Sequence, residues 1–317
     1  MKVFITRDIP EVAYKLLQQN GINFDYYKED RPIPKNILRK KVKDCDALIP
    51  LLTEQIDSHL IDQMPNCKVI ANYAVGYNNI DVDYAKSKKI FVTNTPNVLT
   101  ESTADLTIAL ALSCARRLYE AERMVRLEKY KGWKPKMLLG VEMKGKFFGI
   151  LGAGRIGGAV AVRAHAFGAK IFYYDSHKNY DIENGFYARK VTLNTLLRKS
   201  DFISIHLPLN KNTHHFLNQE RLSLIKSTAI LVNTARGEII DESYLIKMLK
   251  KNKIRCAGFD VYENEPAISN ELLKLNNVVL LPHIGSATEE ARNGMAELAA
   301  RNVINVLKGK KPISPVY

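Results

Sequence analysis

Short hydrophobic runs alternate along the chain with stretches in which hydrophobic residues recur at helical spacing. Strands that are separated by helices pair in parallel through right-handed crossovers, so the alternation predicts an α/β fold built from βαβ units. The first hundred residues carry predicted strands at 2–6, 23–27, 47–51, 69–73 and 90–94, separated by predicted helices at 11–19, 34–42, 54–63 and 82–87.

A long and mostly apolar segment, residues 99–118, is predicted to form a buried helix that connects two lobes. A looser segment, 126–144, follows and contains Trp133, the only tryptophan. Residues 288–307 are again helical in pattern. Between these segments a second βαβ series is predicted, with strands at 146–151, 170–174, 202–206, 229–233, 256–260 and 278–281.

The glycine-rich turn Gly152-Ala153-Gly154-Arg155-Ile156-Gly157 comes directly after a predicted strand and opens a predicted helix. In this context Gly152 permits a tight turn, Gly154 lets a pyrophosphate approach the backbone, and Gly157 lets the helix pack on the strand. The helix N-terminus offers N–H groups and a positive dipole end to the phosphates. The spacing therefore predicts a dinucleotide-binding site.

An acidic residue ends the next predicted strand. Asp175 lies 18 residues after Gly157, where a carboxylate binds the ribose hydroxyls of NAD. Such a carboxylate repels a 2′-phosphate, so NADH is favoured over NADPH, although His177 and Lys178 lie nearby. The alternative is a purely structural turn with Asp175 as a helix cap.

Three residues in the second series follow predicted strands and have the chemistry for reducing a keto acid. Arg236 can bind a carboxylate in bidentate fashion. Histidine is the residue type that titrates near neutrality, so His283 can serve as acid and base, and Glu265 can orient it and stabilise its charged form. Parallel sheets place ligands at the carboxyl ends of their strands, so the three are predicted to share one site. Taken singly, each residue type at such a position is more often an ordinary surface or loop residue, so the prediction depends on their shared location.

Composition limits the remaining classes of protein. A chain of 317 residues with 46% hydrophobic residues is typical of a two-domain globular protein. Four dispersed cysteines, without CxxC or His/Cys spacing, predict a reducing compartment and no metal site. The first residues are typical of a strand and not of a signal peptide, and the longest apolar stretch, 106–115, is about half a membrane span, so a soluble cytoplasmic protein is expected.

The net charge of +14 is compatible with nucleic acid, an anionic membrane or acidic small molecules as partners. The lysines and arginines are dispersed, and no DNA-binding motif is present, so neither nucleic acid nor membrane is predicted as a partner. An NAD-responsive corepressor remains the alternative from a different class, to be separated from an enzyme by turnover and DNA-binding assays.

The sequence resembles the D-isomer-specific 2-hydroxyacid dehydrogenases over almost its whole length. Residues 51–53 and 283–288 resemble the glyoxylate/hydroxypyruvate reductases within that family. The other matching segments are Asn72-Tyr73-Ala74-Val75-Gly76-Tyr77-Asn78-Asn79-Ile80-Asp81, Val92-Thr93-Asn94-Thr95-Pro96, the turn at 152–157, and the segments around Arg236, Glu265 and His283.

The resemblance implies an NAD-dependent oxidoreductase that reduces a small 2-keto acid, glyoxylate or hydroxypyruvate above all, to the D-2-hydroxy acid. It implies His283 as acid/base, Glu265 as its partner, and Arg236, the amides of Val75 and Gly76, and Leu51 as substrate contacts. The implied cofactor contacts are Thr103, Gly152, Gly154, Arg155, Ile156, Gly157, Asp175, His206, Pro208, Thr234, Ala235, Asp260, His283 and Gly285.

The resemblance also implies a fold of two Rossmann-like lobes with a cleft between them. A flavodoxin-like substrate domain would comprise residues 1–100 and 287–317, and a doubly wound NAD-binding domain residues 101–286. A homodimer through the NAD-binding domain is implied, with Trp133 near the partner's active site or simply buried at the interface. D-lactate and phosphoglycerate dehydrogenases are alternatives, but the apolar stretch 49–52 disfavours a phosphorylated substrate.

Overall fold

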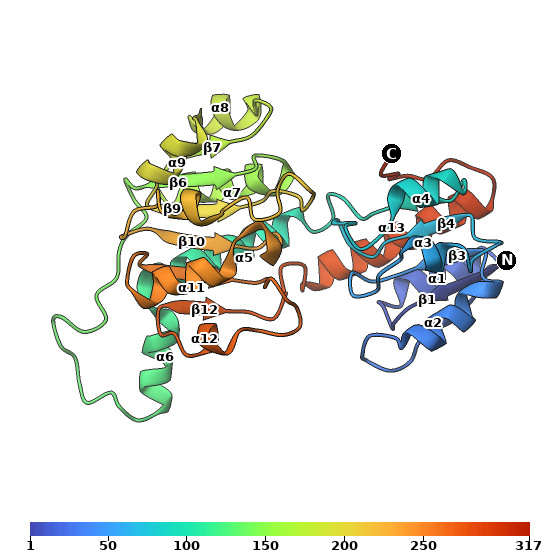
Figure 1. Ribbon diagram of the computed structural model, residues 1–317, viewed down its shortest axis with the longest axis horizontal. Helices are drawn as coiled ribbons and strands as arrows, with labels where there is room; N and C mark the ends of the chain where they lie inside the picture. The colour runs from blue at the N-terminus through green and yellow to red at the C-terminus, as the bar shows by residue number, and fades with distance from the viewer. The chain divides into compact units, whose positions relative to one another are not determined.

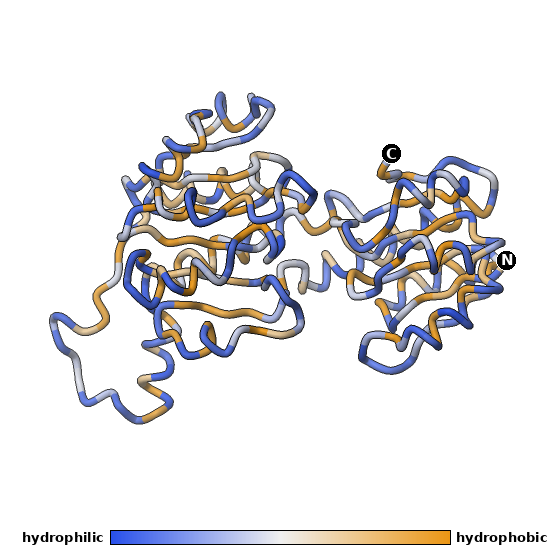
Figure 2. Tube along the Cα trace, in the orientation of Figure 1, coloured by the Kyte–Doolittle hydropathy of each residue, from blue (hydrophilic) through white to orange (hydrophobic).

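The computed structural model describes all residues, 1–317, and the chain divides into two compact units. One unit is formed by Met1–Leu99 together with Ser286–Tyr317, and the other by Thr100–Gly285. Each contains a single parallel sheet with helices packed against it, which confirms the predicted α/β fold class (Figure 1). Hydrophobic residues concentrate in the strands, and the connecting segments are largely hydrophilic (Figure 2).

The unit that contains both termini has a five-stranded sheet in the order β2-β1-β3-β4-β5, which is the flavodoxin-like arrangement. Phe4, Leu48, Ile70 and Val92 are adjacent in register and form a buried row on one face of this sheet. The strands are β1 (Lys2–Ile5), β2 (Asn23–Tyr26), β3 (Ala47–Ile49), β4 (Val69–Ala71) and β5 (Phe91–Thr93), and the helices are α1 (Val12–Gln19), α2 (Lys35–Lys41), η1 (Val42–Asp44), α3 (Ser58–Ile61), α4 (Val82–Ser87) and α13 (Glu289–Leu307).

The last helix of the chain completes this unit. Helix α13 packs against α1 and β4, although it lies about two hundred residues after β4 in sequence. The side chain of Thr288 caps its N-terminus by accepting a hydrogen bond from the amide of Ala291. Beyond α13, the Ser314 hydroxyl donates to the carbonyl of Asn94 at 2.6 Å, which ties the C-terminal segment to the end of β5.

The second unit has a seven-stranded parallel sheet in the order β12-β11-β10-β9-β6-β7-β8. The strand order reverses between β6 and β9, the point at which doubly wound sheets bind their ligands. The strands are β6 (Phe147–Leu151), β7 (Lys170–Tyr174), β8 (Arg189–Lys190), β9 (Phe202–Ile205), β10 (Ile230–Asn233), β11 (Cys256–Phe259) and β12 (Val278–Leu280).

Alternate residues of these strands point to two separate hydrophobic cores. Phe148, Ile150 and Val232 belong to the core under α5 and α7, whereas Leu151 and Leu231 belong to the core under α9 and α11. The helices are α5 (Thr100–Arg116), α6 (Leu118–Arg126), α7 (Arg155–Ala166), α8 (Tyr180–Phe186), α9 (Leu193–Lys199), α10 (Gln219–Leu222), η2 (Gly237–Ile239), α11 (Glu242–Lys250) and α12 (Asn270–Leu273).

Two predicted helices differ from the structure. The helix predicted at 54–63 is reduced to α3, because Glu54 turns inward to accept the Thr6 hydroxyl and the Leu51 amide, and Asp57 caps the helix that follows. The helix predicted at 99–118 ends at Arg116, since Arg117 adopts a left-handed backbone with φ 55°. A separate helix, α6, then begins at Leu118. No helix is long and apolar enough to cross a membrane.

Candidate active site

Arg236, Glu265 and His283 follow three adjacent strands of the second unit. Arg236 comes after β10, Glu265 after β11 and His283 after β12, and these strands pair in parallel, β10 with β11 and β11 with β12. The carboxyl ends of parallel strands lie along one edge of the sheet, so the three residues are placed at the same edge. The glycine-rich turn after β6 opens at that edge too.

The side chains of Glu265 and His283 are hydrogen-bonded. His283 Nδ1 lies 2.8 Å from Glu265 Oε2, and the backbone N–H of Tyr262 donates to Glu265 Oε1 at 3.0 Å. Burial acts to raise the pKa of Glu265, but the hydrogen bond and charge of His283, the Tyr262 amide and the charge of Arg236 outweigh it, and the pKa is lowered. The carboxylate is therefore ionised at neutral pH and holds the ring by Nδ1, which leaves Nε2 as the nitrogen for proton transfer.

The backbone turn that carries His283 is held by Asp260. The buried carboxylate of Asp260 accepts the amide of Ile284 on one oxygen and the amide of Gly285 on the other, both at 2.7 Å. His283 itself has a left-handed backbone, with φ 57°, and its ring reaches the carboxylate of Glu265. Burial raises the pKa of Asp260 in spite of these hydrogen bonds. Asp260, one of the predicted cofactor contacts, thus fixes the loop of the acid/base candidate.

Arg236 lies in a loop that is organised by Asn233, a residue that sequence reasoning did not single out. The Asn233 side chain donates to the carbonyl of Arg236 at 2.8 Å and accepts the amide of Ala235 at 3.0 Å. Asparagine at the end of a strand is typical of such turns, which is the signal that identifies it. Burial lowers the pKa of Arg236, opposed by the charges of Glu265 and Glu238, so the guanidinium stays charged in a sparsely solvated position.

The glycine-rich turn has the shape that a dinucleotide requires. Gly152 has φ 92°, and a Cβ there would meet the carbonyl oxygen of His206 at 2.8 Å. A Cβ on Gly157 would clash with the carbonyl oxygen of Gly152, whereas a Cβ on Gly154 would meet no atom within 4 Å. Gly154 also stands at the N-cap of α7 with no side-chain cap, so the helix end faces open space. These residues fit a pyrophosphate.

Asp175 lies beside this turn at the end of β7. Its Oδ2 accepts the amide of Ala153 at 2.8 Å, and its Oδ1 accepts the amide of His177 at 3.0 Å. The Ser176 hydroxyl also donates to Oδ1, at 3.2 Å, whereas Oδ2 keeps a second lone pair with which the group can accept a ribose hydroxyl. The carboxylate is thus fixed next to the phosphate-binding backbone.

The other predicted cofactor contacts also lie in this unit. Thr103 donates to the carbonyl of Gly285 at 3.2 Å, and the Thr234 hydroxyl lies 2.9 Å from that of Thr107, which sequence reasoning missed. His206 is bonded to Ser204, and burial lowers its pKa to about 3, so it is neutral. The remaining predicted contacts follow strands or open α7, namely Arg155, Ile156, Pro208 and Ala235.

The predicted substrate contacts Leu51, Val75 and Gly76 belong to the first unit, in which hydrogen bonds fix their backbone. The Leu51 amide donates to Thr6 and Glu54, at 3.1 and 3.0 Å. The carbonyls of Val75 and Gly76 accept the side-chain amides of Asn94 and Asn72, both at 2.8 Å. The loop of Val75 and Gly76 is therefore held by two asparagines that sit on or beside β4 and β5.

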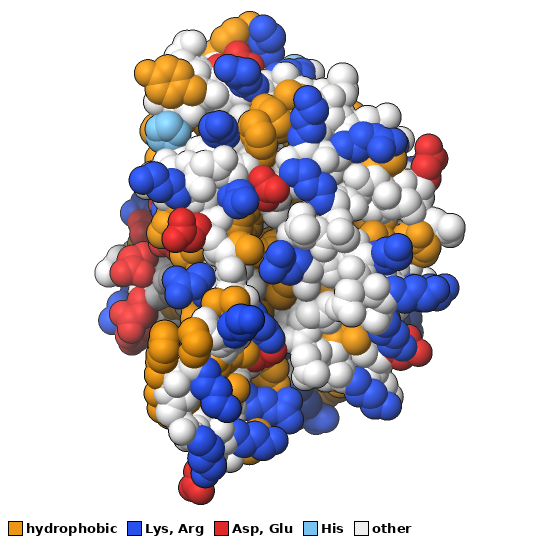
Figure 3. Space-filling model, turned by 90° about the vertical axis from the view of Figure 1, so that its left-hand side faces the viewer, with side chains coloured by type: hydrophobic (Ala, Val, Ile, Leu, Met, Phe, Trp, Pro, Cys, Tyr) orange, Lys and Arg blue, Asp and Glu red, His pale blue; other side chains and the backbone are white.

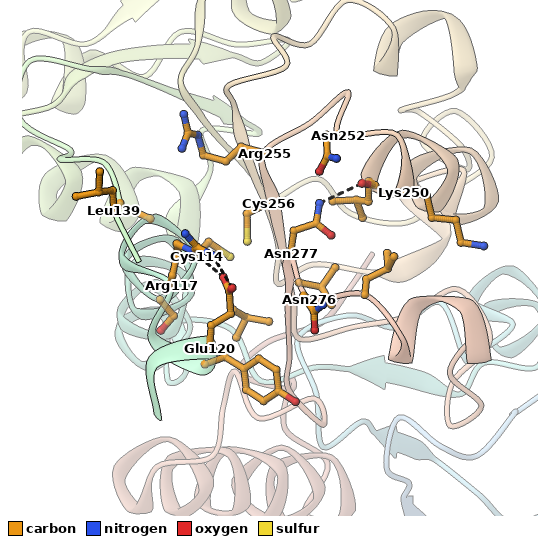
Figure 4. A pocket seen from close by; sticks show the side chains of 18 of the residues that line it. Cys114, Arg117, Glu120, Leu139, Lys250, Asn252, Arg255, Cys256, Asn276 and Asn277 are labelled. Atoms are coloured by element: carbon orange, nitrogen blue, oxygen red, sulfur yellow. Dashed lines mark hydrogen bonds and ion pairs between the residues drawn. The ribbon is translucent and has the colours of Figure 1, made fainter. Parts of the chain in front are cut away.

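A cavity of about 540 Å³ lies at the opposite end of the sheet in the second unit. Figure 4 shows Cys256, at the start of β11, facing Cys114 from α5, whereas the side chain of Asn277, just before β12, turns toward the carbonyl of Leu249. The catalytic candidates follow the other ends of these strands and do not line this cavity. No group of three or more His, Cys, Asp or Glu side chains is arranged to hold a metal ion.

Comparisons with a family model and with known proteins point to the same family. Residues 108–285 match the model of the "D-isomer specific 2-hydroxyacid dehydrogenase, NAD binding domain". The chain is 49% identical over 315 residues to a glyoxylate reductase of Thermococcus litoralis, which covers 98% of this chain and 95% of the relative.

Solved structures agree with this result. The chain is similar to the TT0316 protein of Thermus thermophilus, with a TM-score of 0.94, 40% identity and complete coverage of both chains. It is also similar to a glyoxylate reductase from Paecilomyes thermophila, with a TM-score of 0.89 and 32% identity, over 100% of this chain and 98% of that one. The chain therefore belongs to the D-isomer-specific 2-hydroxyacid dehydrogenases, oxidoreductases that act on the CH–OH group of hydroxy acids.

Proposed function

We propose that the protein is an NADH-dependent reductase of small 2-keto acids, with glyoxylate or hydroxypyruvate as substrate. The observation that carries the proposal is the hydrogen-bonded pair of Glu265 and His283 at the same sheet edge as Arg236 and the glycine-rich turn. The curated relative from Thermococcus litoralis is a glyoxylate reductase, which supports the substrate. Residues 1–100 with 287–317 would be the substrate domain and 101–286 the NAD-binding domain.

In the proposed reaction a hydride and a proton are added across the carbonyl of the keto acid. A nicotinamide cofactor held by the glycine-rich turn and Asp175 would supply the hydride for C2 of the substrate. Protonated His283 donates its Nε2 proton to the developing alkoxide, and ionised Glu265 stabilises the imidazolium before that transfer. Arg236 binds the substrate carboxylate, because its half-buried guanidinium can form two parallel charge-assisted hydrogen bonds with a carboxylate. Contacts to Leu51 and to the amides of Val75 and Gly76 stay predictions.

The proposed preference for NADH depends on Asp175. This carboxylate is bonded to the amide of Ala153 inside the phosphate-binding turn, at 2.8 Å, so it has little freedom to move aside. A 2′-phosphate placed next to it would bring two anions together at short range. The ribose hydroxyls of NADH, in contrast, can donate hydrogen bonds to it.

The test of the reaction is the variant His283→Ala. We expect kcat for glyoxylate reduction to fall about 100- to 10,000-fold, the range for loss of a general acid. NADH binding, followed by fluorescence, should stay within about twofold, because the phosphate-binding turn is untouched. Turnover close to that of the wild type would overturn the assignment of His283. A steady-state screen with glyoxylate, hydroxypyruvate, pyruvate and bulkier 2-keto acids would identify the substrate.

We also propose that the protein forms a homodimer through the second unit. Helix α6 has no buried residue, yet it carries Leu118, Tyr119 and Val125. The segment after it exposes Leu127, Tyr130, Leu139 and Trp133, the last with 77% of its surface accessible. Figure 3, which views the left-hand side of Figure 1, shows hydrophobic side chains among dispersed lysines and arginines.

Exposed hydrophobic side chains that gather in one segment, although charged residues lie between them, indicate a protein partner, and a second copy is the simplest one. Sedimentation of the wild type should give a dimer, and Val125→Glu should shift it toward a monomer. A monomeric wild type at micromolar concentration would refute the dimer.

A further inference from the structure

His215 joins the two loops that carry Arg236 and Glu265, two of the three catalytic candidates. It lies in the segment that follows β9, outside the motifs that predicted the site. Its Nε2 is 2.5 Å from Glu263 Oε1, and Glu263 lies two residues before Glu265. Its backbone N–H donates to the carbonyl of Glu238 at 2.7 Å, and Glu238 lies two residues after Arg236. One residue thus contacts both loops, through its side chain and its backbone.

The two loops are also packed against each other without spare room. A Cβ on Gly237 would overlap with the backbone of Tyr262 and Glu263, so the chains are in direct contact there. The amide of Glu263 donates to Glu242 Oε2 at 3.2 Å, and burial raises the pKa of Glu242. Glu263 is therefore held at its backbone by Glu242 and at its side chain by His215.

The position of Glu263 also affects the acid/base pair, Glu265 and His283, because the neighbouring residue Tyr262 is bonded to Glu265. Tyr262, the residue before Glu263, donates its amide to Glu265 Oε1 at 3.0 Å, and Glu265 Oε2 lies 2.8 Å from His283 Nδ1. A loop that shifts at Glu263 moves the Tyr262 amide and with it the orientation of the Glu265 carboxylate. We propose that His215 is a positioning residue, which clamps Glu263 and thereby keeps Glu265 aligned with His283.

This inference rests on the proposed function, in which His283 transfers the proton. The series of contacts from His215 through Glu263, Tyr262 and Glu265 to His283 is called the relay below. The charged groups at its two ends are as follows. Glu263 faces His215, His214 stacks on it with ring centroids 4.2 Å apart, and Glu242 lies behind Glu263. Around His283 the charged neighbours are Glu265, Asp260 and Arg236. Neither His215 nor Glu263 is expected to touch the substrate.

The experiment compares His215→Ala with His214→Ala in the full-length protein. His214 is exposed and adjacent, but no hydrogen bond links it to the catalytic loops, so it is the matched control. We expect His215→Ala to lower kcat about tenfold, the scale of one charge-assisted hydrogen bond, with KM and NADH affinity changed less than about twofold. The alkaline limb of the kcat profile for reduction should move to lower pH. His215→Gln, which can still donate to Glu263, should recover most of the activity.

A second measurement does not depend on turnover. In the NMR spectrum, the imidazole signals of His283 should titrate at lower pH in His215→Ala than in the wild type, because the misaligned carboxylate stabilises the imidazolium less. The variant Glu263→Ala should give the same shift, and the double variant should be no worse than either single one.

The results separate the inference from the function on which it rests. A wild type without keto-acid reductase activity would refute the proposed function, while the NMR titration would still test the relay. An unchanged His283 titration in both His215→Ala and Glu263→Ala would overturn the relay, and so would additive losses in the double variant. Equal losses in His214→Ala and His215→Ala would also overturn it. If His215→Ala fails to fold, Glu263→Ala and His215→Gln provide the same comparison.

Discussion

The carboxylate of Glu265 faces His283 with one oxygen and is anchored by the other. Oε2 lies 2.8 Å from His283 Nδ1, and Oε1 accepts the Tyr262 amide at 3.0 Å. The anchoring fixes the carboxylate so that its charge and its hydrogen bond act on the same ring nitrogen. In the proposed mechanism, residue 265 must therefore carry a negative charge and not merely a hydrogen-bond acceptor.

The variant Glu265→Gln should therefore lower kcat for reduction about 10- to 100-fold, because the amide accepts a hydrogen bond but does not stabilise the imidazolium. Since reduction needs protonated His283, the loss should be smallest in acid and grow as the pH rises. Steady-state rates between about pH 5 and pH 9 would show this trend. A loss that does not depend on pH would argue for a purely steric role of Glu265.

The position of this pair along the chain was predictable, and its geometry was not. Strand ends are visible in the sequence because each buried strand is a short apolar run, and parallel strands end at one edge. The contact between Glu265 and His283 depends on the turn that Asp260 holds through the amides of Ile284 and Gly285. That turn involves a left-handed backbone at a histidine, which no local pattern specifies.

Residues that act through long-range contacts were missed or misread for the same reason. His215 and Glu263 are 48 positions apart, and each looks like an ordinary loop residue by itself. Glu54 was predicted to begin a helix, but its buried carboxylate accepts a hydrogen bond from the hydroxyl of Thr6, which is also 48 positions away. Asn233 was also missed, although its role is local: its side chain bonds the backbone of Ala235 and Arg236, two and three residues further along.

The glycines of the phosphate-binding turn provide a matched pair of variants. Gly157→Ala places a Cβ against the carbonyl oxygen of Gly152 and should destabilise the fold by about 2 kcal/mol or more. Gly154→Ala meets no atom within 4 Å and should change the unfolding free energy by less than about 1 kcal/mol. It should still weaken NADH binding, because the methyl group points into the space that the phosphates need. Urea unfolding and fluorescence titration measure the two effects, and similar stability of both variants would contradict the packing argument.

Neutral His206 should make stability depend on pH. Burial lowers the pKa of its imidazole from 6.5 to about 3, so between these values the unfolded chain binds a proton that the folded chain does not. The contribution of this group to stability is complete above pH 6.5 and is lost as the pH falls toward 3. In urea unfolding, His206→Gln should therefore lose less stability on acidification than the wild type. His214→Gln, at an exposed histidine, should follow the wild-type curve, and parallel curves for all three proteins would refute a neutral buried His206.

The predicted preference for NADH over NADPH depends on Asp175. Its carboxylate is bonded to the amides of Ala153 and His177, at 2.8 and 3.0 Å, and so forms a fixed negative charge at the end of β7. Replacement by alanine removes the hydrogen-bond acceptor for the ribose and the repulsion of a 2′-phosphate at once. We expect Asp175→Ala to raise KM for NADH and to lower KM for NADPH, so that the ratio of the two kcat/KM values falls at least about tenfold.

The nearby Lys178 sharpens the test of Asp175. In Asp175→Ala, a lysine close to the nucleotide-binding end of β7 is no longer opposed by a carboxylate, so part of the gain with NADPH should disappear in Asp175→Ala/Lys178→Ala. The single variant Lys178→Ala should leave the NADH kinetics close to those of the wild type. A ratio of kcat/KM values that stays unchanged in Asp175→Ala would show that the carboxylate serves only the backbone of the turn, and the choice of cofactor would then have to depend on other residues.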